Sequence, residues 1–436
     1  AGAVLIRDAV LLDGRTVDIR VGAAVEAVGP GLAPGPGEEV LDAAGGTVIP
    51  GLHDHHAHLH AAAAALDSVP VGPAVVRDRD GLRRALAAAP VGADGWIRAV
   101  GYHEAVAGPL DRRLLDALSP PVPVRVQHRS GVLWTLNSIG LARVGLADHP
   151  DGRLRSADAG WSAALPRRPT RLGELSARLA ACGVTGITDA TPDLGIEDIV
   201  ALKTAQRGGP LRQRVHCLAP GKRILHDDRL DLDELTAWIA ARHTDGPVAL
   251  HCVTAAQLVV ALAALRAAGT RPGDRIEHAA VVPDDTLGEL AELGVTVVTQ
   301  PNFVAERGDQ YRTDVPAAEQ HELWRLKSLL RAGIPVALST DAPFGAGDPW
   351  AAMRAAVHRT TAAGHVLNPA ERIDAATALT LFLGDAHRPA RPRRIAVGEP
   401  GDLCVLAAPP PRVLAELDAG LVAATVVAGR GVPRGR

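Results

Sequence analysis

The stretch that decides the fold is Val48-Ile49-Pro50-Gly51-Leu52-His53-Asp54-His55-His56-Ala57-His58-Leu59-His60. An apolar β-type run ends there in a cluster of imidazoles and one carboxylate. Side chains alternate between the two faces of a strand, so His56 and His58 are expected to point the same way. Neutral imidazole is the commonest protein ligand for zinc-like metals. The pair therefore predicts two metal ligands; a polar strand end or a surface histidine cluster is the alternative.

Composition narrows the class of protein. A chain of 436 residues exceeds an ordinary single core, so a large barrel with an accessory domain, or two or three domains, is expected. Lys and Arg number 46 and Asp and Glu 49, a net charge of −3 without long runs of one sign. This balance disfavours nucleic acid or a membrane surface as a partner. The chain shows neither a bilayer-length apolar run nor a signal-peptide pattern, so a cytoplasmic location is expected.

The cysteines and lysines carry different information. Cys182, Cys217, Cys252 and Cys404 are widely spaced and match neither a metal motif nor a disulfide scaffold, so they are expected to be reduced. Lys222 is one of only three lysines in an arginine-rich chain. A lysine is therefore unusual here, and Lys222 is a candidate for a special position.

Both ends of the chain predict short strands. Residues 1–50 contain closely spaced strands and turns, typical of a small antiparallel sheet. Residues 402–406 and 421–427 show the same pattern near the other end. Because chain termini often lie close together, residues 1–50 and 385–436 are expected to form one small β-sandwich domain.

Between those ends, apolar strands alternate with helices, the signature of a parallel α/β sheet or barrel. The predicted strands are 184–188, 214–218, 248–251, 275–277, 295–300 and 336–339, and the predicted helices are 171–181, 232–242, 255–268, 284–293, 317–332 and 349–363. With the histidine-rich strand they give seven units, and a strand near Lys222 would complete eight. The expected fold is a (β/α)8 TIM barrel over residues 51–384.

Residues 66–170 interrupt this alternation. They contain two strand-like runs, 96–102 and 122–128, with a helix between them and a Pro/Arg-rich tail through Pro166 and Pro169. This block is interpreted as an insertion after the first barrel strand, near the mouth of the barrel, where loops commonly carry function.

Polar side chains follow four of the predicted strands. The first strand delivers His56 and His58, and three later strands end in His251, His278 and Asp341. Each of the last three alone could be a hydrogen-bonded core residue or a helix cap. Because catalytic groups of barrel enzymes lie at the carboxyl ends of the strands, the five together predict a metal centre.

With these residues the chain resembles the amidohydrolase superfamily of metal-dependent barrel hydrolases, and within it the branch of YtcJ-type proteins and N-substituted formamide deformylases. The resemblance extends over essentially the whole chain and is specific for the superfamily rather than for a substrate. The motifs that carry it are Pro50-Gly51-Leu52-His53-Asp54-His55-His56-Ala57-His58-Leu59, Gly183-Val184-Thr185-Gly186-Ile187-Thr188-Asp189, Leu250-His251, Glu277-His278, Ser339-Thr340-Asp341-Ala342-Pro343 and Gly398-Glu399-Pro400-Gly401-Asp402-Leu403.

The resemblance implies a ligand set for one or two divalent ions, with Zn²⁺ the expected metal. His56 and His58 would bind the more buried ion, and His251 and His278 the second position. Asp341 would be both a ligand and a proton shuttle. The sequence departs from the branch after His251, where Cys252-Val253-Thr254 stands in place of the usual Gly-Asp pair, so substrate recognition is expected to differ.

Lys222 matches the lysine that is carboxylated and bridges two metal ions in many relatives. Arginine could not replace it, because a carbamate forms on a neutral amine. Only Ala219, Pro220 and Gly221 separate Lys222 from the preceding strand, which leaves no room for the usual helix. A surface lysine in a loop is therefore the alternative.

The implied activity is hydrolysis of a non-peptide carbon–nitrogen bond, in an amide, cyclic amide or formamide, by a metal-bound hydroxide with Asp341 as the proton shuttle. A divalent cation lowers the pKa of its water from about 15.7 towards 7. One alternative is a deaminase of a heterocyclic amine; its candidate acid, Glu277, should point away from His278 by strand alternation. A second alternative is a non-catalytic barrel scaffold.

Further candidates are less specific. A small-molecule substrate is the expected partner, and a homodimer would be an ordinary assembly. Asp54 is expected to orient a ligand histidine, whereas His53, His55 and His60 are expected not to bind metal. The candidate substrate contacts, for which ordinary hydrogen-bonded residues are the alternative, are Tyr102, His103, Glu104, His128, Arg129, Gln300 and Asn302.

Overall fold

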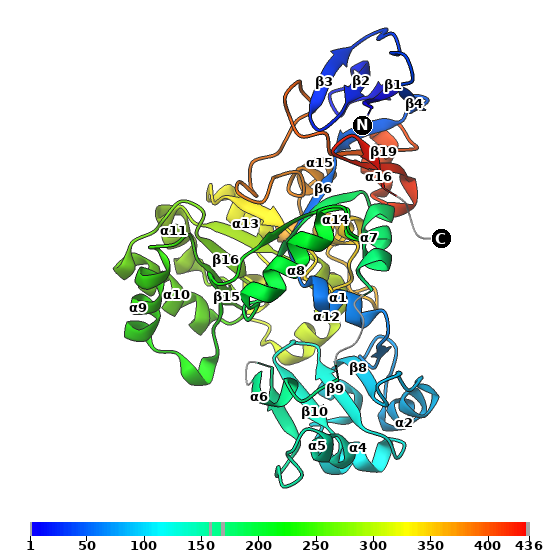
Figure 1. Cartoon of the computed structure of the whole chain (residues 1–436). Helices are drawn as coiled ribbons and strands as arrows, with labels where there is room; N and C mark the ends of the chain where they lie inside the picture. The colour runs from blue at the N-terminus through cyan, green and yellow to red at the C-terminus, as the bar shows by residue number, and fades with distance from the viewer. Residues whose placement is uncertain (1, 157–158, 167–170, 433–436) are drawn as a thin grey trace. The chain divides into compact units, whose positions relative to one another are not determined.

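The computed structural model describes residues 2–156, 159–166 and 171–432. The chain divides into two compact units, one formed by residues 1–58 with 173–436 and the other by residues 59–172 (Figure 1). Pro169, part of the predicted Pro/Arg-rich tail, lies outside the described residues. Among the helices of the described residues, none is long and apolar enough to cross a lipid bilayer.

Strands from both ends of the chain form one sheet in the first unit. β5 pairs with β19 in antiparallel register, which places Ile49 opposite Cys404. The predicted antiparallel arrangement is only partly right, because β1 pairs in parallel with β4 and β5. The sheet has the order β21-β20-β19-β5-β1-β2-β3, with β4 beside β1. Its strands are β1 (Val4–Val10), β2 (Thr16–Val21), β3 (Val25–Gly29), β4 (Glu39–Asp42), β5 (Thr47–Pro50), β19 (Leu403–Leu406), β20 (Val422–Val427) and β21 (Arg430–Gly431).

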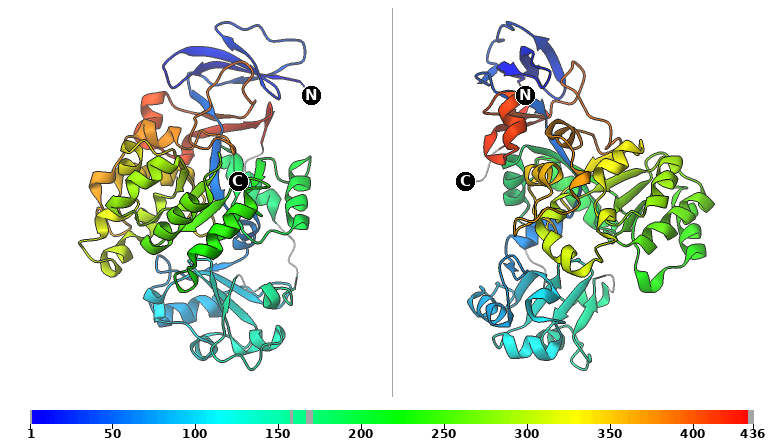
Figure 2. Two further views of the ribbon diagram at one scale, coloured as in Figure 1. Left: turned by 90° about the vertical axis from the view of Figure 1, so that its left-hand side faces the viewer. Right: turned by 180° about the vertical axis from the view of Figure 1, so that it is seen from behind.

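The rest of the first unit is an α/β structure with parallel strands, as its alternating pattern predicts. Three strands form a sheet in the order β13-β12-β6 and five form another in the order β14-β15-β16-β17-β18. Their bounds are β6 (Leu52–Ala57), β12 (Val184–Asp189), β13 (Arg214–Cys217), β14 (Lys222–Ile224), β15 (Ala249–Cys252), β16 (Arg275–His278), β17 (Thr296–Thr299) and β18 (Val336–Leu338). Figure 2 shows these strands from two further directions.

β13 and β14 link the two sheets. β13 pairs with β12, whereas β14 pairs with β15. Two neighbouring parallel strands need a connection of about a dozen residues or more, but only residues 218–221 lie between β13 and β14. β14 therefore continues β13 after a kink, and Lys222 stands at the start of a strand. The alternative of a surface loop lysine is wrong, since Lys222 is only 4% exposed.

The ends of β6 and β18 are held together by the backbone. The Asp341 amide donates to the His56 carbonyl at 2.9 Å, and the His58 amide donates to the Ala342 carbonyl at 2.8 Å. These bonds lie just beyond the last residue of β18. They fix the positions at which His56, His58 and Asp341 leave the backbone.

Helices follow most of the parallel strands. The predicted helix over 317–332 is wrong in its first part, because the left-handed φ of 48° at Trp324 interrupts it. The predicted helix over 349–363 is shorter, because Arg359 ends it with a left-handed φ of 52°. The helices are α7 (Leu172–Ala181), α8 (Ile196–Gln206), α9 (Leu232–Arg242), α10 (Ala255–Ala268), α11 (Asp284–Leu293), α12 (Asn302–Asp314), α13 (Leu326–Arg331), α14 (Pro349–His358), α15 (Ala375–Thr380) and α16 (Pro410–Glu416).

The second unit has its own sheet and core. The two predicted strands correspond to β8 and β9, and α3 and α4 lie between them in the chain. The sheet order is β11-β10-β9-β8-β7, formed by β7 (Val69–Pro70), β8 (Ile97–Tyr102), β9 (Val124–His128), β10 (Leu133–Leu136) and β11 (Arg153–Arg155). Its helices are α1 (Leu59–Ala65), α2 (Arg79–Ala88), α3 (Glu104–Ala107), α4 (Arg112–Leu118), α5 (Ser138–Arg143) and α6 (Ala159–Ser162).

Gly51, which joins β5 to β6, gives a test of the packing beneath the histidine-rich strand. A Cβ at Gly51 would lie 2.1 Å from Thr185 Oγ1 on β12. Gly51→Ala is therefore expected to lower the free energy of unfolding by about 1–3 kcal/mol. Gly288→Ala in α11 is the control, because nothing lies within 4 Å of its added Cβ, and helix propensity favours alanine by about 1 kcal/mol. Urea unfolding measures both, and equal stabilities would contradict the packing.

Candidate metal centre

Three ligand groups converge where β6 and β18 end. One ligand atom from each of His56, His58 and Asp341 lies within 4.8 Å of the other two, and all three residues are largely buried. Asp341 Oδ1 lies 3.2 Å from His56 Nε2 and 3.1 Å from His58 Nε2. His56 Nε2 is buried without a hydrogen bond. Two imidazole nitrogens and a carboxylate around one point fit a divalent cation.

Glu277 fixes the His56 ring. Its Oε1 accepts a hydrogen bond from His56 Nδ1 at 2.7 Å, so His56 Nε2 keeps its lone pair for a metal. Arg275 holds the same carboxylate through Nε at 2.9 Å and Nη2 at 2.5 Å. Burial would raise the pKa of Glu277, but Arg275 and His56 hold it well below its usual value. Glu277 is thus an ionised, fully buried positioning residue.

The prediction from strand alternation is wrong for Glu277 and His278. The two were expected on opposite sides, yet both contact His56: Glu277 by its hydrogen bond and His278 with ring centroids 4.7 Å apart. His278 ends β16 with a left-handed φ of 73°. Alternation holds only for extended backbone, so this residue turns back towards the site.

His278 and His251 extend the cluster. The His251 ring lies 4.5 Å from the His278 ring, centroid to centroid. His278 Nδ1 is 2.6 Å from Gln300 Oε1, and Gln300 Nε2 donates to Ser339 Oγ at 2.8 Å. Burial lowers the pKa of His278 to about 3. Gln300, a candidate substrate contact, therefore has both ends of its amide bonded within the protein.

Asn302 and Asp54 support the loop that carries Asp341. Asn302 Nδ2 donates to the Thr340 carbonyl at 3.0 Å, and its buried Oδ1 has no hydrogen-bond partner within the described residues. Asp54 accepts from the Thr340 amide at 3.0 Å and from Thr340 Oγ1 at 2.5 Å. It also accepts from the His56 amide at 3.4 Å, so it contacts the backbone of this histidine, and its role in orienting a ligand histidine stays a prediction. Burial raises the pKa of Asp54 to about 6.

Two further side chains reach this end of the strands. Thr191 Oγ1 is 2.9 Å from His58 Nδ1, which directs His58 Nε2 towards Asp341. Lys222 Nζ donates to the Ala190 carbonyl at 2.8 Å. Burial lowers the pKa of Lys222, while the charges of Glu277 and Asp341 oppose that shift.

The histidines expected not to bind metal are not part of the converging group. The His53 ring is 2.9 Å from Thr188 Oγ1 and stacks on the His55 ring at 4.5 Å. His60 belongs to α1 in the second unit.

The remaining candidate substrate contacts form a cluster of their own in the second unit. Glu104 Oε2 lies 3.0 Å from His128 Nε2 and 3.6 Å from His103 Nε2. The Tyr102 hydroxyl donates to the Gly108 carbonyl at 2.6 Å, and the Arg129 amide donates to the Tyr102 carbonyl. Their role in binding a substrate stays a prediction.

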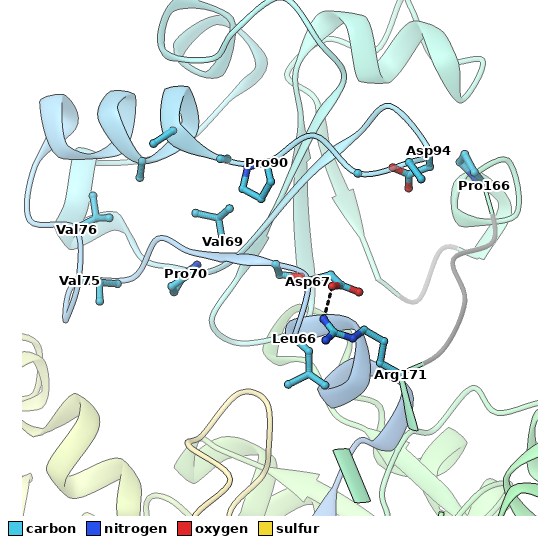
Figure 3. Close-up of a pocket in the computed structure, with 16 residues that line it drawn as sticks. Leu66, Asp67, Val69, Pro70, Val75, Val76, Pro90, Asp94, Pro166 and Arg171 are labelled. Carbon is cyan, nitrogen blue, oxygen red and sulfur yellow. Dashed lines mark hydrogen bonds and ion pairs between the residues drawn. The ribbon is translucent and has the colours of Figure 1, made fainter. Parts of the chain in front are cut away.

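A cavity of about 990 Å³ in the second unit has a different character (Figure 3). Its walls are mainly apolar, including Val69, Val75 and Val76. Asp67 and Arg171 form an ion pair there at 2.6 Å. Among the described residues that line it, the ionisable groups are Asp67, Asp94 and Arg171.

Comparison with known families decides the identity of the site. The sequence model of the amidohydrolase family matches residues 39–433, from β4 to beyond β21. The chain belongs to this amidohydrolase family. It is therefore a metal-dependent hydrolase of carbon–nitrogen bonds, and the group of His56, His58 and Asp341 is one that could hold a metal ion.

Individual proteins resemble this amidohydrolase over most of its length. It is 26% identical to N-substituted formamide deformylase from Arthrobacter pascens, over 88% of this chain and 86% of that protein. A metal-dependent hydrolase from Pyrococcus horikoshii OT3 shares the fold, with a TM-score of 0.73, 19% identity and coverage of 94% and 98% of the two chains. N-isopropylammelide isopropylaminohydrolase from Burkholderia multivorans aligns with a TM-score of 0.54 at 17% identity, over 100% and 99%.

Sequence reasoning on this amidohydrolase missed the supporting roles of three residues. Glu277 stands directly before a predicted ligand, and a carboxylate beside a metal-site histidine could have been considered as its hydrogen-bond partner. Thr191 lies two residues after β12, where the carboxyl end of a parallel strand is a place to look. Arg275, which pairs with Glu277, gave no signal of its own.

Proposed function

We propose that this amidohydrolase releases an acyl group from nitrogen in a small amide, cyclic amide or formamide. The convergence of His56, His58 and Asp341 carries the proposal, because it provides a metal-binding group and a carboxylate base at one point. The similarity to N-substituted formamide deformylase over most of both chains favours formamides within this class. Zn²⁺ is the proposed metal, since two imidazoles and a carboxylate suit it.

The protein's own residues would share the chemical work. When bound, the divalent ion supplies Lewis acidity that acidifies water and polarises a carbonyl. His56 and His58 would hold the ion through Nε2, since Glu277 and Thr191 occupy their Nδ1 atoms. Asp341 is positioned to accept a proton from the attacking water and return it to the leaving nitrogen. Its pKa is held well below the usual value despite burial, chiefly by His56, so it starts as a base.

A second metal position is part of the proposal. His251 and His278 would hold it, and Lys222 would bridge the two ions as a carbamate. The buried amine supports this role, because burial favours the neutral form that reacts with carbon dioxide. Lys222 also lies at the start of β14, on the same strand pair as His251.

Lys222→Ala is expected to lower the metal content from about two ions per chain to one or none, because the bridge is lost. Lys327→Ala is the matched control, a lysine on α13 outside the site. Elemental analysis of protein grown with zinc and bicarbonate gives the metal content, and intact mass reports the added carbon dioxide. Equal metal content in the two variants, without the added mass in the parent protein, would rule out the bridge.

The finer architecture is also proposed. The two parallel sheets would close as one TIM barrel over residues 51–384, with residues 66–170 inserted near its mouth. The kinked connection of β13 to β14 and the backbone bonds between β6 and the end of β18 support closure. Residues 1–50 and 385–436 would form the β-sandwich domain, supported by the sheet that both ends share.

The structure weakens the case for a deaminase. That activity needs an acid near the second metal position, and Glu277 was its candidate. Both oxygens of Glu277 are engaged by His56 and Arg275, and its pKa is well below the usual value. Glu277 therefore has no proton to donate at neutral pH.

A paired substrate panel tests the proposed function. Zinc-loaded protein is incubated with N-substituted formamides and amides, and in parallel with heterocyclic amines, while acid, amine and ammonia are measured. Acid and amine in equal amounts from the first set, lost on chelation, are expected. Ammonia from the second set without acid from the first would favour a deaminase and overturn the proposal.

A further inference from the structure

A second cavity, lined by several arginines, lies at the amino ends of the strands whose carboxyl ends carry the candidate metal site. Its volume is about 790 Å³, and it is lined by the segments that precede β14, β15 and β16 together with residues 386–391. Gly221, Pro247 and Gly273 mark those three segments. The metal ligands, in contrast, stand within or after the strands. All walls of the cavity belong to the first unit.

The walls of this basic cavity carry an excess of positive charge. Asp245 is the single acidic residue among the described residues that line it. The basic groups are Arg242, Arg271, Arg275, Arg388 and Arg391, together with His216 and His387. Arg275 and Arg388 form ion pairs with Glu277 and Asp385, which do not line the cavity. The other three guanidinium groups face one carboxylate and leave the cavity with an excess of positive charge, although the chain as a whole carries a net charge of −3.

Two of these cations lack a counter-charge among the described residues. Within the part of the chain that the structure describes, the guanidinium groups of Arg242 and Arg391 have neither a hydrogen bond nor an ion pair. Arg275 is 4% exposed, and its guanidinium is turned away to Glu277 and the His55 carbonyl. The two unpaired arginines are therefore the groups of the cavity that are free to bind an acceptor from outside the chain.

The positive charge of the cavity also affects its histidines. The His216 and His387 rings lie 4.9 Å apart in an edge-to-face contact. Burial lowers the pKa of His216 to about 4, with smaller contributions in the same direction from His387, Lys203 and Arg275.

We propose that this basic cavity binds a small, multiply charged anion of the phosphate ester or pyrophosphate class. The planar guanidinium fork suits the oxygens of phosphate, and charge-assisted hydrogen bonds to it are strong. The volume falls in the usual range for small-molecule sites. Arg275 also pairs with Glu277, which bonds to His56. The side chains of Arg275 and Glu277 therefore connect the cavity to His56, a candidate metal ligand.

Pyrophosphate binding tests the proposal, measured by calorimetry at constant ionic strength on chelated full-length protein so that metal does not compete. Arg242→Gln/Arg391→Gln removes the two unpaired cations of the cavity. Arg229→Gln/Arg331→Gln is the control, because it makes the same change in net charge at exposed positions outside it.

The cavity variant is expected to bind pyrophosphate at least about tenfold more weakly than the parent protein, because it loses two charge-assisted contacts. The control variant should bind within about twofold of the parent. Absence of binding to the parent protein at millimolar concentration, or equal weakening in both variants, would overturn the proposal. Urea unfolding confirms that both variants fold.

Discussion

Asp341→Asn is expected to lower turnover by roughly 10²–10⁴-fold, because an amide cannot relay the proton between water and the leaving nitrogen. Asparagine keeps the shape of the side chain, and the left-handed φ of 57° at this position is one that asparagine tolerates. His56 and His58 remain, so the variant should retain bound metal. Steady-state kinetics on an amide or formamide substrate, with elemental analysis, measure both quantities.

The control for Asp341→Asn is Asp285→Asn. Asp285 lies in the first turn of α11 and its side chain is exposed, so this change should leave turnover within about twofold of the parent. Activity of the Asp341→Asn protein within tenfold of the parent would contradict the role of Asp341. Loss of metal together with activity would make Asp341 chiefly a ligand.

Glu277→Gln is expected to weaken metal binding by about 10–100-fold, since a neutral amide makes a poorer partner for the His56 Nδ1 proton. The same change leaves the buried Arg275 without its counter-charge, and breaking a buried ion pair costs about 3–5 kcal/mol. Urea unfolding in the presence of a chelator measures the stability loss alone, and a zinc titration of folded protein measures the affinity.

Glu234→Gln provides the matched comparison for this change. Glu234 also pairs with an arginine, Arg223, but its side chain is 53% exposed, and exposed pairs contribute less than about 1 kcal/mol. The two variants should therefore differ in stability by several kcal/mol. Similar stabilities, or an unchanged zinc affinity in Glu277→Gln, would show that the contact between Glu277 and His56 does not support the metal site.

The sequence was sufficient to predict the parallel strands and the convergence of His56, His58 and Asp341. Each of these residues follows an apolar run with clear strand character, and the carboxyl ends of parallel strands meet at one edge. The registers of β6, β12 and β15 to β18 bring these strand ends together, and backbone bonds beyond β6 and β18 then hold His58 and Asp341 in place. Predictions based on strand period therefore succeed where the backbone is extended.

The errors fall where the backbone departs from regular geometry. His278 and Trp324 have left-handed φ values, which neither residue type indicates in the sequence. The left-handed φ of His278 lets both Glu277 and His278 contact the His56 ring. The left-handed φ of Trp324 divides a predicted helix. The bonds of Asp54 to Thr340 could not be predicted for a different reason, because they depend on a contact across 286 positions of the chain.

Arg359 shows how distant segments fix such departures. Its fully buried guanidinium donates to the carbonyls of Leu367, Trp324 and Leu323. These bonds satisfy carbonyls around the left-handed Trp324 and the end of α14. A buried arginine that ends a helix is not visible from periodicity, because its partners come from two other segments of the chain.

Zinc stoichiometry tests the central claim most directly. Equilibrium dialysis of the parent protein is compared with His56→Gln/His58→Gln, and His358→Gln/His365→Gln serves as the control at exposed positions. The parent and the control should each bind at least about one ion per chain with the affinity of a structured site, and the His56→Gln/His58→Gln protein should bind none at that site. Equal zinc binding by all three folded proteins would contradict a metal centre at the ends of β6 and β18.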